Sequence, residues 1–451
     1  MQERGAIDAT GRPGTARLVA CALVAGASLA GCGWFGGDDE IILEGERIPI
    51  LVHERQVRPD AALASLQVVL PRPVANTEWA QPGGVPSHAM QHPAIADELK
   101  RAWSVDVGEG ASDKRFLLSS PVVADGRVFT MDADTEVTAL DAESGKKLWS
   151  AELMLEEEEG SAVGGGIAYQ DGRLFVTTGF AQVIALDAES GEEIWRQSVP
   201  GPARAAPTVA AERVFVVTID NQLHALDIGD GHSLWTHSGI VEIAGLLGGA
   251  SPAVEKGVVV VPYSSGELYA LRVANGRMLW SDNLSPVRRS DVVSLITAIR
   301  GLPVIDGGRV YAISHGGRMV AIDMRSGQRV WDKTFGGMHA PWVVGDYIYV
   351  LTIGSELVCL TRKDGRIRWV VALRPFEDMA NKDDPIHWLG PVLAGDRLIV
   401  TGSHGEALAI SPYTGELLGK LNLPDPVAVM PVVANGTIYF LTDDAELIAL
   451  R

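Results

Sequence analysis

The chain has 451 residues, with 38 basic and 57 acidic side chains and a formal charge of −19. This balance argues against nucleic acid as a partner, because neutralising phosphates requires clustered Lys and Arg. Hydrophobic residues make up 47% and charged residues 21%, which is typical of a folded globular protein. Three cysteines exclude a disulfide scaffold.

The first 31 residues have the features of a signal peptide. A 13-residue apolar run from Leu18 to Ala30 is too short to cross a bilayer as a permanent helix, but it suits a signal peptide. The run ends in Leu29-Ala-Gly-Cys32, which resembles the bacterial lipobox, whose Cys carries the lipid. An ordinary signal peptide with an incidental Cys is the alternative. We expect Cys32 to be the lipidated mature N-terminus. Gly33, in place of the Asp that retains enterobacterial lipoproteins at the inner membrane, favours the outer membrane and its periplasmic face.

Residues 32–97 are predicted to be a lipid-anchored linker rich in Pro and Gly. Seven prolines punctuate residues 49–93, and no hydrophobic period holds for long. A tether needs no structure of its own. Two short apolar runs, 48–52 and 66–70, could add as edge strands or dock on the folded body.

One alternating segment rich in β-branched residues recurs eight times, and its pattern predicts a strand. The copies span residues 136–141, 182–187, 222–227, 267–272, 318–323, 356–361, 406–411 and 446–451. A Gly-containing turn follows most copies, and Asp-Gly or Asn-Gly pairs upstream indicate hairpins. Each unit therefore has about four strands in roughly 40–50 residues, as in a propeller blade.

The eighth unit has no fourth strand after its third. A spare copy lies at the front of the repeats, where 101–107 matches 147–153. We expect this strand to complete the last blade, which removes the exposed edges. The predicted fold is all-β: an eight-bladed β-propeller of four-stranded antiparallel blades over residues 98–451, closed by an N-terminal strand.

A Trp recurs at one position of the repeat, in the predicted fourth strand. The seven copies are Trp103, Trp149, Trp195, Trp235, Trp280, Trp331 and Trp369, and the seventh unit has Gly419 there instead. We expect each ring to fill the gap between neighbouring blades. The alternative, an aromatic binding cage, requires clustered and exposed rings, which regular spacing disfavours.

The pattern Ala-Leu-Asp-x-x-Ser-Gly-x-x-x-Trp resembles the repeat of the quinoprotein, or PQQ-like, propeller superfamily. One branch contains dehydrogenases that use pyrroloquinoline quinone, Ca²⁺, an Asp base and usually two adjacent cysteines. This sequence has no adjacent cysteines. Its candidate Ca²⁺ ligands lie at predicted turns between strands: Asp132, Asp134, Asp220, Asn221, Asp443 and Asp444. We therefore expect no cofactor, no metal and no catalysis, and keep a periplasmic quinoprotein dehydrogenase as the alternative.

The other branch is the outer-membrane assembly factor family BamB, whose members are lipoproteins. That resemblance implies a non-catalytic scaffold that docks on a periplasmic POTRA domain of the barrel subunit BamA. It also implies a propeller that is monomeric within a hetero-complex, with unfolded β-barrel proteins as possible further partners. The family's two docking motifs match loosely before Pro252 and Pro303. The matching residues are the expected partner contacts: Leu246, Leu247, Arg288, Arg289, Asp291 and Arg300. For the two leucines, burial under the blade is the alternative.

Overall fold

The computed structural model describes residues 57–154, 164–203, 205–242, 248–285, 297–427 and 429–451. Within these ranges there are 34 β-strands and one short 3₁₀ helix, η1 (Ala61–Leu63). None of the described helices has the length and apolar character that crossing a membrane requires. The strands form eight four-stranded antiparallel sheets and one two-stranded hairpin.

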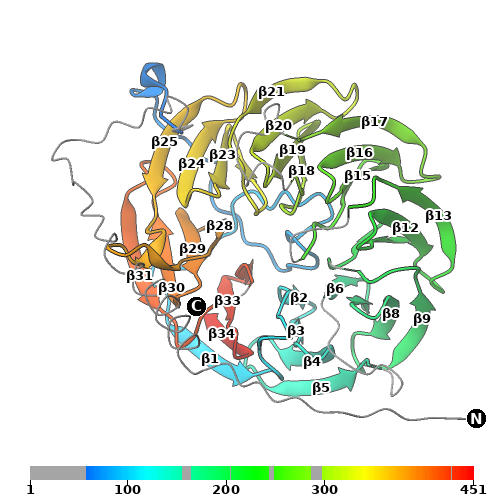
Figure 1. Ribbon diagram of the computed structural model, residues 1–451. Helices are drawn as coiled ribbons and strands as arrows, with labels where there is room; N and C mark the ends of the chain where they lie inside the picture. Colours follow the sequence, from blue (N-terminus) through cyan, green and yellow to red (C-terminus); the bar gives the residue numbers. More distant parts are fainter. Residues whose placement is uncertain (1–56, 155–163, 204, 243–247, 286–296, 428) are drawn as a thin grey trace, which may run out of the picture. The chain divides into compact units, whose positions relative to one another are not determined.

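The sheets are the blades of a propeller, numbered here in chain order (Figure 1). Blades 1 and 2 contain β2 (Val122–Ala124), β3 (Arg127–Met131), β4 (Glu136–Asp141), β5 (Lys147–Glu152), β6 (Gly165–Gln170), β7 (Arg173–Thr178), β8 (Gln182–Asp187) and β9 (Glu193–Ser198). Blades 3 and 4 contain β10 (Thr208–Ala210), β11 (Arg213–Val217), β12 (Gln222–Asp227), β13 (Ser233–Ser238), β14 (Ala253–Glu255), β15 (Val258–Pro262), β16 (Glu267–Arg272) and β17 (Met278–Asn283).

Blades 5 and 6 contain β18 (Val304–Asp306), β19 (Arg309–Ser314), β20 (Arg318–Asp323), β21 (Arg329–Lys333), β22 (Trp342–Val344), β23 (Tyr347–Leu351), β24 (Glu356–Thr361) and β25 (Ile367–Ala372). Blade 7 contains β28 (Trp388–Ala394), β29 (Arg397–Gly402), β30 (Glu406–Ile410) and β31 (Leu417–Asn422). The hairpin of β26 (Phe376–Asp378) and β27 (Asp383–Pro385), between blades 6 and 7, is an addition that the repeat does not predict.

Blade 8 joins the two ends of the repeat region. It contains β32 (Val432–Ala434), β33 (Thr437–Leu441), β34 (Glu446–Leu450) and β1 (Arg101–Asp106). Strand β1 pairs antiparallel with β34, with Trp103 opposite Ala449. The eight-bladed ring closed by an N-terminal strand is thus confirmed.

Each blade buries its middle strands and leaves its outer strand half exposed. In blade 1, β3 and β4 are buried along most of their length, whereas β5 alternates between exposed and partly buried residues. The turn after β4 is held by Asp141, whose Oδ1 accepts hydrogen bonds from the Ser144 N–H and hydroxyl, both of which lower the pKa of Asp141. Gly145 has φ +71, so a residue without a Cβ suits this turn.

The outer-strand Trp of one blade packs against this turn of the next blade. The Trp280 Nε1–H donates to the Met324 carbonyl, 2.8 Å away, and a Cβ on Gly327 would lie 2.5 Å from the Trp280 side chain. The same bond to the following blade is made by Trp103, Trp149, Trp195, Trp235, Trp331 and Trp369. Seven of the eight interfaces between blades therefore contain a Trp ring.

Much of the expected linker is folded against the propeller. From residue 57, the first that the structure describes, the chain belongs to the same compact unit as the propeller, so the described part of the predicted linker (residues 32–97) is not a free tether. Residues 74–94, here called the inner loop, close on themselves, because the Val74 N–H donates to the His92 carbonyl and the Ala94 N–H to the Val74 carbonyl. Figure 1 shows this segment in blue across the centre of the ring.

The inner loop hydrogen-bonds to all eight blades in turn. Its contacts to blades 8, 1, 2 and 3 come from Asn76, Trp79, Ala80 and Gln81, and those to blades 4, 5, 6 and 7 come from Pro86, Ser87, Gln91 and Pro93. Because the innermost strand of each blade is a sheet edge, the loop satisfies backbone groups that would otherwise face an open channel. Residues 1–56, including Cys32, lie outside the described residues.

Candidate functional site

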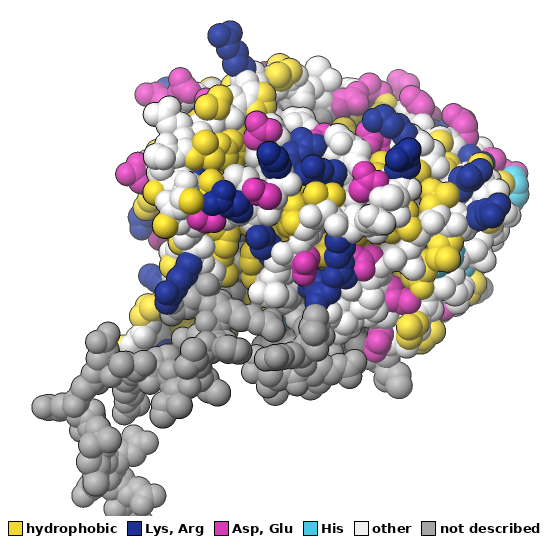
Figure 2. Space-filling model, turned by 90° about the horizontal axis from the view of Figure 1, so that it is seen from above, with side chains coloured by type: hydrophobic (Ala, Val, Ile, Leu, Met, Phe, Trp, Pro, Cys, Tyr) yellow, Lys and Arg dark blue, Asp and Glu magenta, His cyan; other side chains and the backbone are white. Residues whose placement is uncertain are grey.

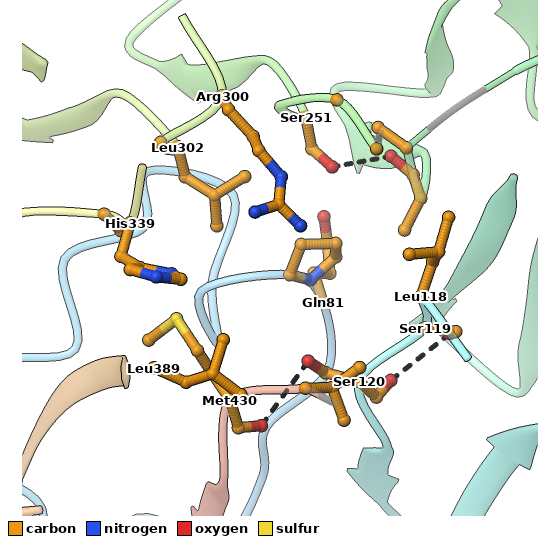
Figure 3. Close-up of a pocket in the computed structure, with 18 of the residues that line it drawn as sticks. Gln81, Leu118, Ser119, Ser120, Ser251, Arg300, Leu302, His339, Leu389 and Met430 are labelled. Carbon is orange, nitrogen blue, oxygen red and sulfur yellow. Dashed lines mark hydrogen bonds between the residues drawn. The ribbon is translucent and has the colours of Figure 1, made fainter. Parts of the chain in front are cut away.

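A pocket of about 150 Å³ lies at the centre of the ring (Figure 3). Its walls come from the connecting loops, which link the outer strand of one blade to the innermost strand of the next. Gln81 and Pro82 of the inner loop also line it. The Gln81 side chain is fixed by two hydrogen bonds to the backbone of Val209, at 2.8 and 2.9 Å. The pocket is thus built by several blades and by the inner loop together.

Arg300 points into this pocket from the connecting loop before β18 (Figure 3). Its guanidinium makes no hydrogen bond or ion pair with the described part of the chain, and burial lowers its pKa. Arg still stays protonated, because its ordinary pKa lies above 12. The described residues that line the pocket include no Asp or Glu. Arg300 is the one charged side chain among the described lining residues of this pocket. An adjoining cavity of about 520 Å³, which Arg300 and His339 also line, includes Asp113 and Asp443.

The other polar groups of the pocket are neutral. His339 is partly buried in the pocket, and this burial, followed by the nearby Arg300 charge, lowers the pKa of His339 to about 3. The Ser251 hydroxyl donates to the Ala206 carbonyl at 2.7 Å, and the Ser120 hydroxyl donates to the Met430 carbonyl at 3.5 Å. A protonated guanidinium that lacks a partner attracts a carboxylate, which it can bind with two parallel hydrogen bonds.

The residues present do not fit a quinone with its Ca²⁺ ion. Such a hard cation needs several convergent carboxylate or amide oxygens, and the pocket's described lining residues offer no carboxylate. Asp132, at a turn, uses its two oxygens to accept hydrogen bonds from the backbone N–H groups of Glu109, Asp134 and Glu136. We therefore derive no chemical step through a quinone.

Of the other candidate ligands, Asp220, Asn221 and Asp134 have hydrogen-bond or ion-pair partners within the chain. The Asp220 carboxylate accepts from the Thr218 hydroxyl and the Gln222 amide, and Asn221 holds the Ile240 carbonyl. Asp134 pairs with Arg115. Burial raises the pKa of Asp443, and no described residue hydrogen-bonds to its Oδ1. Asp444 is the neighbour whose charge also contributes to that rise.

One further cluster has a spacing suitable for a cation. Asp227, Asp230 and His232 come close together in the exposed turn after β12. The Asp227 carboxylate accepts from the Gly229 N–H, and Asp230 bonds to the His232 ring at 2.6 Å. Ordinary turn hydrogen bonds account for this arrangement.

Most of the expected partner contacts lie outside the described residues. They are Leu246, Leu247, Arg288, Arg289 and Asp291. Arg300 is described, and the structure places its side chain inside the central pocket. A partner would have to reach into the pocket to touch it.

The structure adds exposed apolar side chains on the same connecting loop as the expected leucines. Ile240 is 59% and Val241 64% exposed. Their backbone is nevertheless held, because the Ile240 N–H donates to Glu267 at 2.7 Å and its carbonyl accepts from Asn221 at 2.6 Å. Two adjacent exposed apolar side chains on a hydrogen-bonded loop are a starting point for an interaction surface, although isolated exposed apolar residues are common on proteins. In the sequence, the signal for this surface is the apolar pair Ile240 and Val241, which lies just before the residues that loosely match the family's first docking motif, upstream of Pro252.

Comparison with known proteins agrees with the fold. The family model described as "Outer membrane protein assembly factor BamB" matches residues 155–371 and 378–451. A model described as "Glucose/ethanol/alcohol dehydrogenase, beta-propeller domain" matches residues 92–171. Among solved structures, BamB from Moraxella catarrhalis superposes with a TM-score of 0.67 at 18% identity, covering 78% of this chain and 100% of that one. A europium-containing methanol dehydrogenase gives 0.65 at 16% identity, covering 81% and 89%. These two likenesses show the fold alone.

Sequence relatives are more specific. The outer membrane protein assembly factor BamB of Vibrio cholerae is 31% identical over 361 residues, which is 79% of this chain and 90% of that protein. The protein of the same name in Escherichia coli is 28% identical over 356 residues, covering 77% and 88%. That of Yersinia pestis is 26% identical over 359 residues, covering 76% and 88%. With its repeats, its ring and these relatives, the chain belongs to the BamB family of outer membrane protein assembly factors.

Proposed function

We propose that this chain is a non-catalytic lipoprotein scaffold of the machinery that assembles β-barrel proteins in the outer membrane. Membership of the BamB family supports the accessory role. The signal-like segment that ends at Cys32 supports a lipid anchor on the periplasmic face. The lack of carboxylates among the pocket's described lining residues supports a binding function rather than quinone chemistry.

The docking face in this proposal is the one where the connecting loops gather around the pocket mouth. Strand order puts the turns between second and third strands on that same face, so Ile219, 37% exposed, lies on it with Ile240 and Val241. Asn221, two residues after Ile219, donates its side-chain N–H to the Ile240 carbonyl. Leu246, Leu247, Arg288, Arg289 and Asp291 lie on the same two connecting loops and are the further proposed contacts.

The unpartnered guanidinium of Arg300 is the single observation that carries the docking proposal. A partner carboxylate that enters the pocket would gain a charge-assisted pair in a partly buried setting, where such pairs are strong. The proposed partner is a periplasmic POTRA domain of a BamA-like subunit, which would supply an Asp or Glu there. Its apolar groups would cover Ile240 and Val241.

The test measures binding between the mature chain and the periplasmic part of the BamA-like subunit. The double variant Ile240→Asp with Val241→Asp should weaken binding at least tenfold, because the new carboxylates would be desolvated in the interface. The matched control places two Asp residues at Leu148 and Val330, which are 46% and 43% exposed on the outer strands β5 and β21. Equal binding by both folded variants would contradict the proposed face.

Leu246→Asp with Leu247→Asp tests the predicted motif in the same assay, with a melting curve beside it. Loss of binding with unchanged melting would support exposed contacts. A collapsed melting temperature would support burial of the two leucines under the blade and remove them from the interface.

A further inference from the structure

One interface between blades lacks the Trp that the others contain. In blade 1 the pairing register runs across the strands from Phe129 to Ala139 to Trp149. The same register in blade 7 runs from Ile399 to Ala409 to Gly419. Gly419 therefore stands at the Trp position, and an aliphatic residue stands where blade 1 has Phe129.

A cavity of about 510 Å³ occupies this position between blades 7 and 8. Ile399, Ala409 and Gly419 line it from blade 7. From blade 8 the wall includes Phe440 and Leu450, and the lining surface is mostly apolar. Its volume lies in the range of sites that bind ligands, about 300–1,000 Å³.

The cavity is open at Gly419 itself. A Cβ built on Gly419 meets no atom within 4 Å, and the backbone there is not left-handed, so a side chain can start from this position without strain. At the other interfaces the Cβ of the receiving turn Gly would collide with the Trp ring, as at Gly191 and Gly231. The eighth site thus has the walls of a Trp site without the ring.

The receiving turn is also missing at this interface. In blades 2 to 7 a turn joins the third strand to the outer strand and supplies the carbonyl that accepts the indole N–H. In blade 8 these two strands are β34 and β1, which are not consecutive in the chain. Without that carbonyl, a ring that has no N–H to satisfy, such as phenyl, suits the cavity best.

The outer strand of blade 7 is free to receive another chain. Within the described residues β31 pairs with β30 alone, and all six of its residues are exposed. Leu417, Leu418 and Leu421 of this strand are 60%, 55% and 40% exposed. A free strand edge accepts an extended peptide through main-chain hydrogen bonds, and an aromatic side chain opposite an edge Gly covers it.

We propose that this vacant Trp site binds an extended polypeptide segment, which adds along β31 and places an aromatic side chain in the cavity. The exposed Arg101 lines the same cavity, and its guanidinium makes no hydrogen bond or ion pair with the described residues, so an acidic residue beside the aromatic one would strengthen binding. This site is separate from the connecting-loop face, and its test does not depend on a barrel subunit.

The experiment titrates a fluorescein-labelled seven-residue peptide with a central Phe and one flanking Glu into the mature chain and measures anisotropy. The matched peptide carries Ala in place of Phe. The proposal expects the Phe peptide to bind at least tenfold more tightly. Equal affinity of the two peptides, or no binding of either, would overturn it.

Two pairs of variants locate the peptide. Gly419→Trp should fill the cavity, raise the melting temperature and reduce peptide affinity at least tenfold, whereas Gly419→Ala should bind as the parent does. If Gly419→Trp does not fold, a second pair decides. Leu421→Asp, on the cavity wall, should weaken binding, and Leu417→Asp, more exposed on the same strand and outside the wall, should not. Unchanged affinity in Leu421→Asp would overturn the proposed location.

Discussion

A single Trp ring connects neighbouring blades through both packing and one hydrogen bond. Trp280 is 8% exposed, and its N–H donates to the Met324 carbonyl. Trp280→Ala should lower the free energy of unfolding by roughly 3–5 kcal/mol, because a large cavity would open between two sheets. Trp280→Phe should recover most of the packing and leave the carbonyl unpaired, at a cost of about 1–3 kcal/mol. Urea denaturation measures both. Equal losses of unfolding free energy in Trp280→Ala and Trp280→Phe would show that packing is not the main contribution of Trp280 to stability.

Burial of a titratable group on the inner loop links stability to pH. His88 is fully buried, its Nδ1–H donates to the Pro303 carbonyl at 2.7 Å, and burial lowers the pKa of His88 to about 4. The unfolded chain, with an ordinary pKa near 6.5, takes up the proton first as pH falls. The protein should therefore lose stability between about pH 6.5 and pH 4, by roughly 3 kcal/mol from this group.

Melting curves across that pH range check the prediction. His88→Asn keeps a donor for the Pro303 carbonyl and cannot take up a proton, so its acid-side loss should be smaller. His232→Asn is the control, because His232 is exposed and the pKa of His232 is raised by Asp230. The prediction is wrong if both variants follow the pH dependence of the parent.

Among the elements, the inner loop is the one that we expect to stabilise the ring most. It bonds to every blade, and Trp79 stacks on Trp342 of blade 6 with ring centroids 6.3 Å apart. Removing residues 33–56 should leave the melting temperature nearly unchanged. Removing residues 33–94 should lower the free energy of unfolding by several kcal/mol, since inner-strand backbone groups would lose their partners. Equal melting of the two truncated chains would show that the loop is dispensable.

The closing strand is a second such element. Lys100 and Arg451 exchange backbone hydrogen bonds at the end of the β1–β34 pair. Extending the deletion through residue 107 would remove β1 and expose the edge of β34. We expect this chain to aggregate at concentrations where the chain lacking residues 33–94 stays monomeric, and size-exclusion chromatography distinguishes the two. Similar elution of both would contradict a closure role for β1.

For the whole molecule, the sequence predicts the ring better than the site. The eight repeats carry their own strand pattern, turn Asp, turn Gly and Trp, so local chemistry defines each blade, and the spare strand at 101–107 shows the closure. The inner loop escapes prediction because it contacts the blades mainly through backbone groups and has no period. Arg300 was found by its offset in a motif, but its position in the pocket depends on loops from several blades. Gly419 was visible as a break in the Trp pattern, although the cavity beside it depends on the walls of two blades.

Charge does not mark one dominant interaction surface on the side of the molecule shown in Figure 2. Basic, acidic and apolar side chains are interspersed there. The two binding sites that we propose rest instead on particular groups, the unpartnered guanidinium of the central pocket and the vacant Trp site.

Arg300→Gln should weaken partner binding and reduce the dependence of that binding on salt. Arg300→Lys should keep part of the affinity and part of the salt dependence, because Lys retains the charge without the planar pair of donors. Binding measured at two salt concentrations tests this, and a salt dependence unchanged in Arg300→Gln would contradict the role of Arg300.

The most direct test of the scaffold proposal is co-purification of the tagged, lipidated chain from the cell envelope, with the bound proteins identified by mass spectrometry. We predict that a BamA-like barrel subunit is recovered in amounts comparable to the tagged chain. The recovery should fall with Asp at Ile240 and Val241 and persist with Asp at Leu148 and Val330. Recovery of no barrel subunit above the level of an untagged control would contradict the account.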